Sequence, residues 1–330
     1  MRIFHYISIL IFVFVIGVFV YQYSPHYQII KGDIFGTYYN IKIRTDNKNN
    51  ELKNKIKEKL QEINSIMSVF EPDSEISKIN NAPAKQKIEL SPSMQEVIRA
   101  SDKVYWQSGG YFDPSLGRLI DLWGFGASSK TSPTPKEIKQ ALQVSGFNKL
   151  KFSHNFQYIT KISSQTMLNL SAIAKGWATD EIAALLDKEG YQNYIVEIGG
   201  EIKTRGYREP GTPWSIGINR PSAGSSDNIM ALVLSNMAVA TSGNYRNFYS
   251  ADGKILGHTI SFQTGEPVST DVASASVFHS SCMMADAYAT TIVAMGVEKG
   301  LEFANRQKLK VIIFDKEFNQ HVSKAAQKMF

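Results

Sequence analysis

Asp286 and Thr290 stand four residues apart in the stretch SSCMMADAYATTIVAMG, residues 280–296, where Asp286 is the only charged residue. The stretch predicts an apolar helix, on which residues four apart lie one above the other on the same face. A buried carboxylate without a partner is costly, so this face must meet water or a positive group. The two oxygen ligands suit Mg²⁺, which completes its coordination with water and substrate phosphates. Spacing alone favours a structural alternative, in which Asp286 satisfies amides at the helix start and Thr290 bonds back to a carbonyl.

Three other stretches hold candidate functional residues, each with a structural alternative. His258, in LGHTISFQTGEPV, lies beside turn-forming residues and is a possible general base, although a lone histidine is more often structural. Lys175 and Gly176, in LNLSAIAKGWATD, stand near a predicted helix start, which suits an anion; an exposed lysine and a glycine that permits close packing explain them equally well. The stretch YFDPSLGRLIDLWGFG, residues 111–126, is suited to holding a flat ring, but on its own it is more simply a packed irregular loop.

Several common functional motifs are absent from the sequence. It has no GxxxxGK[ST] and no GxGxxG between a strand and a helix, so neither a P-loop nor a Rossmann site is supported. It has no HExxH or CxxC, so a zinc site is unsupported. The net charge of +6 is modest and no basic cluster is interleaved with aromatic residues, so no nucleic-acid partner is expected. The single cysteine, Cys282, cannot form an internal disulfide, and its apolar neighbours favour a buried thiol.

Helices and strands are segregated along the chain, which predicts an α+β fold with mixed or antiparallel sheets flanked by helices. Apolar spacing and capping residues predict helices over 51–68, 91–107, 173–190, 280–296 and 297–306, and another opening at 134–137. Alternating or short apolar runs predict strands over 36–43, 193–198, 201–206, 214–219, 229–235, 255–261, 272–278 and 310–314. Gly199 and Gly200 read as a hairpin turn.

The N-terminus differs in composition from the rest of the chain. Residues 6–23 are apolar and uncharged, and Arg2 precedes them, which predicts a membrane anchor over residues 1–23 with the rest of the chain exported. A cleaved signal peptide is the alternative, but no small-residue cleavage site follows the apolar run. Residues 24–33 read as a short tether, and residues 34–330 as the functional domain.

Nine segments, taken together and in order, resemble the ApbE family, the FAD:protein FMN transferases. They are GTYYNIKI, FEPDSEISKIN, GYFDPSLGRLIDLWGFG, LSAIAKGWATD, IGGEIKTRG, WSIGINRP, TSGNYRNFY, GHTISFQTG and ADAYATT, between about residues 34 and 296. Each segment is weak alone, but nine in the family order are specific.

The resemblance implies a bilobed α+β enzyme that binds FAD between its lobes with Mg²⁺. Such an enzyme transfers the FMN half to a Thr or Ser hydroxyl of an acceptor protein and releases AMP. The acceptors in the family are often membrane or exported redox subunits. With the predicted anchor, this implies a catalytic domain on the periplasmic side of a bacterial inner membrane.

The resemblance also implies roles for particular residues. His258 would be the base that deprotonates the acceptor hydroxyl. Asp286 and Thr290 would be side-chain ligands of Mg²⁺, and the backbone carbonyl of Ala172 would be a third ligand. The residues that would contact FAD are Phe35, Phe70, Tyr111, Phe112, Asp113, Asn169, Lys175 and Ile260.

The sequence departs from the family pattern at several positions. The family usually has Met at Phe35, Tyr at Phe70, Asp at Asn169, Asp-Pro at Ser261-Phe262 and, in some members, a further Asp at Ala289. These departures bear on cofactor and metal affinity more than on the reaction class, because His258, Asp286 and Thr290 are all present. Two alternatives remain: hydrolysis of FAD to FMN and AMP at the same site, and a membrane-anchored flavin-binding protein without catalysis.

Overall fold

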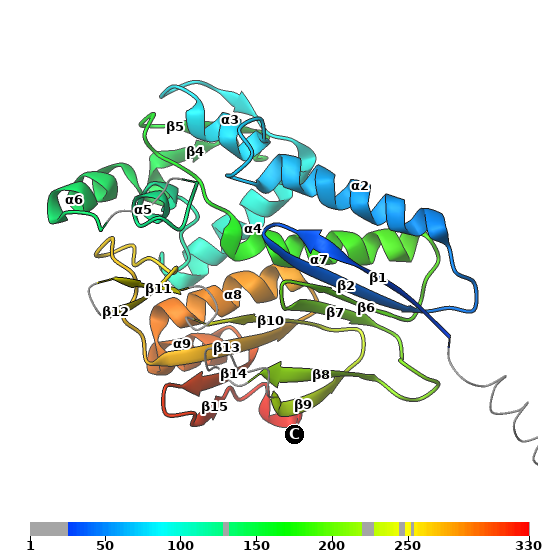
Figure 1. Cartoon of the computed structure of the whole chain (residues 1–330). Coiled ribbons are helices and arrows are strands. Elements are labelled where there is room, and N and C mark those ends of the chain that lie inside the picture. The colour runs from blue at the N-terminus through cyan, green and yellow to red at the C-terminus, as the bar shows by residue number, and fades with distance from the viewer. Residues whose placement is uncertain (1–25, 128–131, 220–227, 244–247, 252–253, 330) are drawn as a thin grey trace, which may run out of the picture.

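A large antiparallel sheet runs through the molecule and carries helices on one face (Figure 1). The computed structural model describes residues 26–127, 132–219, 228–243, 248–251 and 254–329. Within these residues the sheet has the strand order β1 (Tyr27–Ile34), β2 (Thr37–Arg44), β6 (Tyr194–Ile198), β7 (Glu201–Arg205), β10 (Ala238–Ser242), β13 (Val272–His279), β14 (Lys310–Asp315) and β15 (Gln320–Val322). All neighbouring strands pair antiparallel, which confirms the α+β class.

The predicted tether over residues 24–33 is wrong from Tyr27 onward, because residues 27–34 form the edge strand β1. It pairs with β2 along its whole length, from Tyr27 opposite Arg44 to Ile34 opposite Thr37. Only two of its residues, Gln28 and Ile30, are buried. An edge strand with so few buried positions lacks the apolar alternation that marks a central strand.

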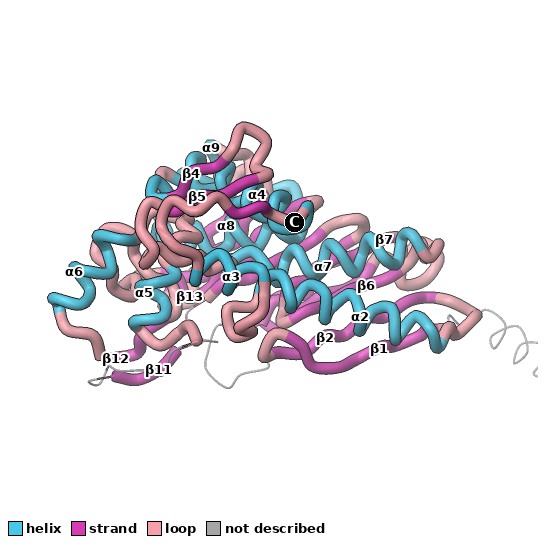
Figure 2. Tube along the Cα trace, turned by 90° about the horizontal axis from the view of Figure 1, so that it is seen from above, coloured by secondary structure: helices cyan, strands magenta, loops and turns pink. Residues whose placement is uncertain are grey.

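The helices match the predicted segments closely, except for two short helices over 75–81 and 117–122, where no helix is predicted. They are α2 (Asn50–Met67), α3 (Glu75–Asn81), α4 (Pro92–Ser108), α5 (Gly117–Leu122), α6 (Pro135–Val144), α7 (Ser171–Lys188), α8 (Cys282–Met295) and α9 (Val297–Arg306), with short 3₁₀ turns at Phe147–Lys149 and Gln327–Met329. Ser91 caps α4, and Pro92 occupies its first turn. Thr134 and Glu137 form the predicted capping box of α6. Figure 2 shows from above how α2 and α7 run along the sheet.

The two faces of the large sheet pack against different partners. On β14, Val311 and Ile313 belong to the main core beneath the helices, whereas Ile312 and Phe314 belong to a second apolar cluster. That second cluster includes residues of the hairpin formed by β8 (Trp214–Asn219) and β9 (Asn228–Leu234), which covers the opposite face. The uninterrupted apolar run of β14 follows from burial on both faces.

Two smaller sheets complete the described fold. One has the order β3 (Ile88–Glu89), β5 (Tyr158–Lys161) and β4 (Leu150–Phe152), and the other pairs β11 (Phe248–Ala251) with β12 (Lys254–Gly257). The strand predicted over 255–261 is wrong beyond Gly257, because the chain folds back on itself there. The N–H of Ser261 donates to the carbonyl of Glu266, and the carbonyl of Ser261 accepts from the N–H of Gly265. Ile260 forms only an isolated bridge with Pro267.

In the described residues, no helix has the length and apolar character needed to span a membrane. The anchor predicted over residues 1–23 lies outside the described residues.

Helices α7 and α8 approach closely where Gly176 faces the first turns of α8. A Cβ at position 176 would lie 2.4 Å from the carbonyl oxygen of Cys282 and 2.8 Å from Cβ of Asp286. No side chain fits at such distances without moving one of the helices. Of the two explanations for this glycine, close packing is therefore confirmed.

We predict that Gly176→Ala lowers the free energy of unfolding by about 1–3 kcal/mol, because the added methyl group overpacks the α7–α8 contact. Helix propensity alone predicts the opposite sign, a gain of up to about 1 kcal/mol. Urea unfolding of the two proteins measures the difference. A variant as stable as the parent, or more stable, would contradict the close contact.

Lys161, at the end of β5, is fully buried and has no acidic partner among the described residues. Its ammonium group donates to the carbonyl oxygens of Asn80 and Ser164. The Asn80 side chain in turn donates to the carbonyl of Leu168 and accepts from its N–H group. Lys161 thus supports the segment that leads into α7, and burial lowers its pKa to about 8.

We predict that the parent protein gains stability relative to Lys161→Met as the pH rises from about 8 toward 10.5, the ordinary lysine pKa. Below this window lysine is protonated in both states, and the folded state bears the cost of a buried charge. Within it the folded protein binds fewer protons than the unfolded chain, so stability rises with pH.

Urea unfolding of both proteins at several pH values across this window measures the effect. The matched control is Lys151→Met, which removes an exposed lysine from the neighbouring strand β4. A stability difference between parent and Lys161→Met that does not change with pH would contradict the assignment.

Candidate active site

Asp286 lies in the interior of the molecule, and a positive group does sit against it. Its side chain is 1% exposed, and its Oδ2 atom accepts a hydrogen bond of 3.0 Å from the backbone N–H of Gly176. The ammonium group of Lys175 lies 3.8 Å from the same oxygen. The negative charge of Asp286 on the apolar helix α8 is therefore balanced by two groups of α7, the N–H of Gly176 and the ammonium group of Lys175.

A second carboxylate, Glu201, completes this charged cluster and was not predicted from the sequence. It is 3% exposed, and its Oε1 atom lies 3.3 Å from the ammonium nitrogen of Lys175. Burial raises the pKa of Glu201, the charge of Lys175 lowers it, and the charge of Asp286 raises it. Burial alone would lower the pKa of Lys175, but the charges of Asp286 and Glu201 outweigh it and raise that pKa.

The donor set at this cluster fits Mg²⁺. Two buried acidic side chains face one ammonium group, and Oε2 of Glu201 has no hydrogen-bond partner among the described residues, so an acidic oxygen of the cluster is left for a further partner. Thr290 places its hydroxyl oxygen 3.1 Å from that of Ser242 on β10. Carboxylate and hydroxyl oxygens are ligands that Mg²⁺ accepts, and the ion keeps several waters. In the described residues, no group of three or more His, Cys, Asp or Glu side chains is arranged to hold a metal ion.

The regular hydrogen-bond pattern of α7 relates the carbonyl of Ala172 to Asp286 through Gly176. In a helix this carbonyl accepts from the N–H four residues later, which belongs to Gly176. That N–H group donates to Asp286, so Ala172 and Asp286 compete for one donor. Helix geometry thus links the Ala172 carbonyl and Asp286 through the N–H of Gly176, and the role of this carbonyl as a metal ligand stays a prediction.

Asp180, one turn further along α7, fixes the start of α8. Its carboxylate accepts from the Ser281 hydroxyl at 2.8 Å and from the N–H groups of Cys282 and Met283 at 3.0 Å each. It also pairs with the ammonium group of Lys203 on β7 at 2.6 Å. Free N–H groups at a helix start favour a carboxylate, so this contact sets the position of α8 against α7.

The segment before α7 is hydrogen-bonded to residues 111–126, which we call the predicted FAD-binding loop. The N–H of Asn169 donates to the carbonyl of Pro114 at 2.8 Å, and Oδ1 of Asn169 accepts from the N–H of Ser171 at 3.0 Å. Asp113 uses both carboxylate oxygens within the protein, accepting from the N–H groups of Ser115 and Phe147. Burial raises the pKa of Asp113, against these hydrogen bonds.

Tyr111 and the segment that carries His258 lie together. The Tyr111 ring stands 5.4 Å from that of Phe262, and its hydroxyl accepts from the Lys299 ammonium group at 3.3 Å. The half-buried ring of His258 stands 6.4 Å from that of Phe125. Ile260 is 4% exposed and packs in an apolar cluster with α5 and α6.

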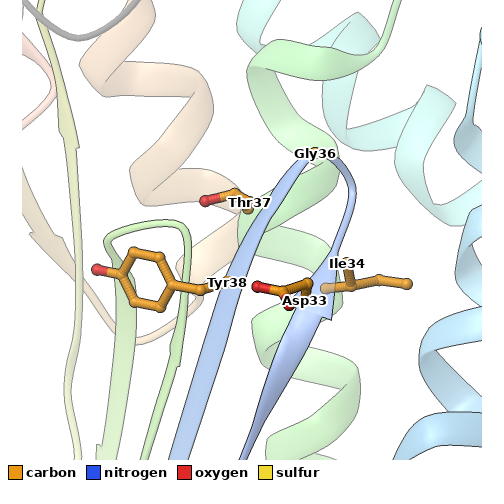
Figure 3. A pocket seen from close by; sticks show the side chains of 5 residues that line it. All are labelled: Asp33, Ile34, Gly36, Thr37 and Tyr38. Atoms are coloured by element: carbon orange, nitrogen blue, oxygen red, sulfur yellow. The ribbon is translucent and has the colours of Figure 1, made fainter.

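The β1–β2 turn forms an open pocket of about 620 Å³ (Figure 3). Asp33, Ile34, Gly36, Thr37 and Tyr38 line this pocket. Phe35, at the tip, has a φ of 55°, which is unusual for a bulky residue. Thr37 faces Gly199, where a Cβ would lie 2.9 Å from Cγ2 of Thr37 and 3.4 Å from Cδ of Lys175. The turn therefore borders the charged cluster.

Two predicted FAD contacts differ from the others in position. The side chain of Phe112 is 3% exposed and packs in the main core, so a contact with FAD would have to come from its backbone. Phe70 follows α2 and is 66% exposed. The Cys282 thiol is buried, as expected, and burial raises its pKa well above the ordinary value.

Known proteins of one family are similar to this chain over most of its length. The model of the ApbE family matches residues 35–313. A protein from Vibrio cholerae serotype O1 named FAD:protein FMN transferase is 33% identical over 304 residues, covering 89% of this chain and 90% of the relative. One of the same name from Escherichia coli K12 is 30% identical over 303 residues, covering 89% and 86%.

Solved structures agree. Flavin transferase ApbE from Vibrio cholerae superposes with a TM-score of 0.86 at 30% identity, covering 93% of this chain and all of the other. The apo flavinyl transferase ApbE of Pseudomonas stutzeri gives a TM-score of 0.82 at 28% identity, covering 93% and 98%. The family model matches most of the chain, and the relatives are similar to it over nearly their full length. This protein therefore belongs to the ApbE family.

Proposed function

We propose that this protein transfers FMN from FAD to a Thr or Ser hydroxyl of an acceptor protein, with Mg²⁺, and releases AMP. The observation that carries the proposal is the buried cluster of Asp286, Glu201 and Lys175 at the start of α7 in a chain of this family. The names of the relatives, FAD:protein FMN transferase, support the same reaction.

The reaction exchanges one phosphorus–oxygen bond for another. The acceptor oxygen bonds to the phosphorus of the FMN half, and the bond from this phosphorus to the bridging oxygen breaks. AMP leaves with the bridging oxygen, and the hydroxyl proton passes to a base. The two needs of such a step are a base at the nucleophile and positive charge at the phosphate oxygens.

The charged cluster meets the second need. Asp286, Thr290 and the Ala172 carbonyl would hold Mg²⁺, which supplies neutralising charge to the diphosphate. Lys175 has a side chain that is 30% exposed, so its ammonium group is able to contact a phosphate while Glu201 and Asp286 hold it. The Tyr111–Asp113 segment, Asn169 and the β1–β2 turn with Phe35 would surround the rest of FAD.

His258 is the proposed base. Its segment packs against the predicted FAD-binding loop through Phe262 and Tyr111, and its ring is half-buried. Histidine is the side chain that most often serves as a general base in catalysis. Its role is to orient the acceptor hydroxyl and take its proton.

Incubating the purified protein with FAD, Mg²⁺ and a candidate acceptor, followed by mass spectrometry of the acceptor, tests the proposal. We expect the acceptor mass to rise by that of FMN less one water, and AMP to appear in equal amount. Free FMN and AMP with an unmodified acceptor would indicate a hydrolase instead. Unchanged FAD that stays bound would indicate a binding protein without catalysis.

We predict that His258→Ala lowers the transfer rate by about 10²- to 10⁴-fold, the usual contribution of a general base, and leaves FAD binding in place. Initial rates of FMN attachment and a separate FAD titration measure the two effects. The matched control is His154→Ala, which removes an exposed histidine in the turn between β4 and β5. An unchanged rate in His258→Ala would show that another group takes the proton.

The acceptor and the cellular location stay predictions from the sequence. The apolar run over residues 6–23 and the family resemblance support a membrane anchor and a periplasmic catalytic domain. An exported or membrane redox subunit would then be within reach as the acceptor.

A further inference from the structure

Glu201 carries a charge that its place in the fold does not require. The two-residue turn of Gly199 and Gly200, with φ of 59° and 96°, fully accounts for the β6–β7 hairpin. Glu201 follows this turn at the start of β7, opposite Ile198, and is 3% exposed. A buried carboxylate opposes folding unless it is well paired, so an apolar side chain would suit the strand better.

The contacts of Glu201 are made toward the charged cluster. Its Oε1 atom lies 3.3 Å from the ammonium nitrogen of Lys175, whereas Oε2 has no hydrogen-bond partner among the described residues. Lys175 lies farther from Asp286, at 3.8 Å. The ammonium group therefore stands between two carboxylates and closer to Glu201.

The hairpin holds this arrangement in place. A Cβ at position 199 would lie only 2.9 Å from Cγ2 of Thr37 and 3.4 Å from Cδ of Lys175, so the turn packs directly on the lysine stem. A side chain at position 199 would collide with Thr37 and lie against the lysine stem. Lys175 is therefore positioned by two groups: the glycine turn contacts its stem, and Glu201 pairs with its ammonium group.

The position of the Lys175 ammonium group affects cation binding, because this group and a divalent cation compete for the carboxylate of Asp286. If Asp286 were the only acid present, Lys175 would settle on it, and a carboxylate paired with an ammonium group is a poor ligand. With Glu201 present, the contacts of Asp286 among the described residues involve only Oδ2, and Oδ1 is left for another partner.

We propose that Glu201 is a positioning residue, which holds the Lys175 ammonium group off Asp286 and so keeps this carboxylate available to a divalent cation. The proposal rests on the metal site of the proposed function. It assigns Glu201 no direct contact with the cation or with FAD. Its effect on cation binding must therefore depend on Lys175.

A double-mutant cycle on the full chain tests this dependence, with Mn²⁺ alone as the probe, no FAD, and free Mn²⁺ followed by electron paramagnetic resonance. We expect Glu201→Gln to weaken Mn²⁺ binding by about tenfold, as loss of an orienting partner typically does. In a Lys175→Met background the same change should alter affinity by no more than about twofold, the usual limit for uncoupled sites. Thermal unfolding of each variant checks that it is folded.

Two further variants separate the possible outcomes. Glu197→Gln, the same change on β6 at a carboxylate that contacts Tyr38, serves as the matched control and should leave Mn²⁺ affinity unchanged. Asp286→Ala should abolish binding; if it does not, the metal assignment fails and this proposal with it. If Asp286→Ala abolishes binding but Glu201→Gln is silent, or acts equally in both backgrounds, only the role given to Glu201 is overturned.

Discussion

The hydrogen bond between Gly176 and Asp286 joins the two helices on which the site is built. The N–H group of Gly176 on α7 donates to Asp286 on α8 at 3.0 Å. The helices approach this closely only because position 176 has no Cβ, which would collide with the Cys282 carbonyl. The same N–H is the ordinary helical donor for the Ala172 carbonyl. The proposed metal ligands from two helices thus meet at a single glycine, and a shift of either helix would separate them.

Two ion pairs between β7 and α7 hold α7 in the position that the contact between Gly176 and Asp286 requires. Glu201 and Lys203 lie two residues apart on β7, and residues at this spacing share one face of a strand. Glu201 pairs with Lys175 and Lys203 pairs with Asp180, so each element contributes one charge of each sign. Reversing or shifting α7 would bring like charges together. Because Asp180 also caps α8, the pairing that positions α7 on the sheet positions α8 as well.

The sequence predicted what depends on local chemistry. The capping box at Thr134 and the apolar run of β14 are signals within a few residues, and the helix and strand form where expected. The edge strand β1 was missed because only Gln28 and Ile30 are buried. The partners of Asp286 lie 110 residues away at Gly176, and no spacing rule connects them. Glu201 is not predicted because the glycine turn before it explains its motif without it, and the same hairpin carries Glu197, Lys203 and Arg205, so one more charged residue gives no signal.

The departures from the family pattern concentrate the negative charge of the site on fewer groups. Asn169 accepts the Ser171 N–H through an amide oxygen, so an uncharged side chain keeps the backbone contact that a carboxylate would make. Ala289 is fully buried in α8, so position 289 adds no acid. Asp286 and Glu201 are then the carboxylates that face Lys175. With two acids sharing one ammonium group, small changes in the position of Lys175 decide how much charge Asp286 offers to a cation.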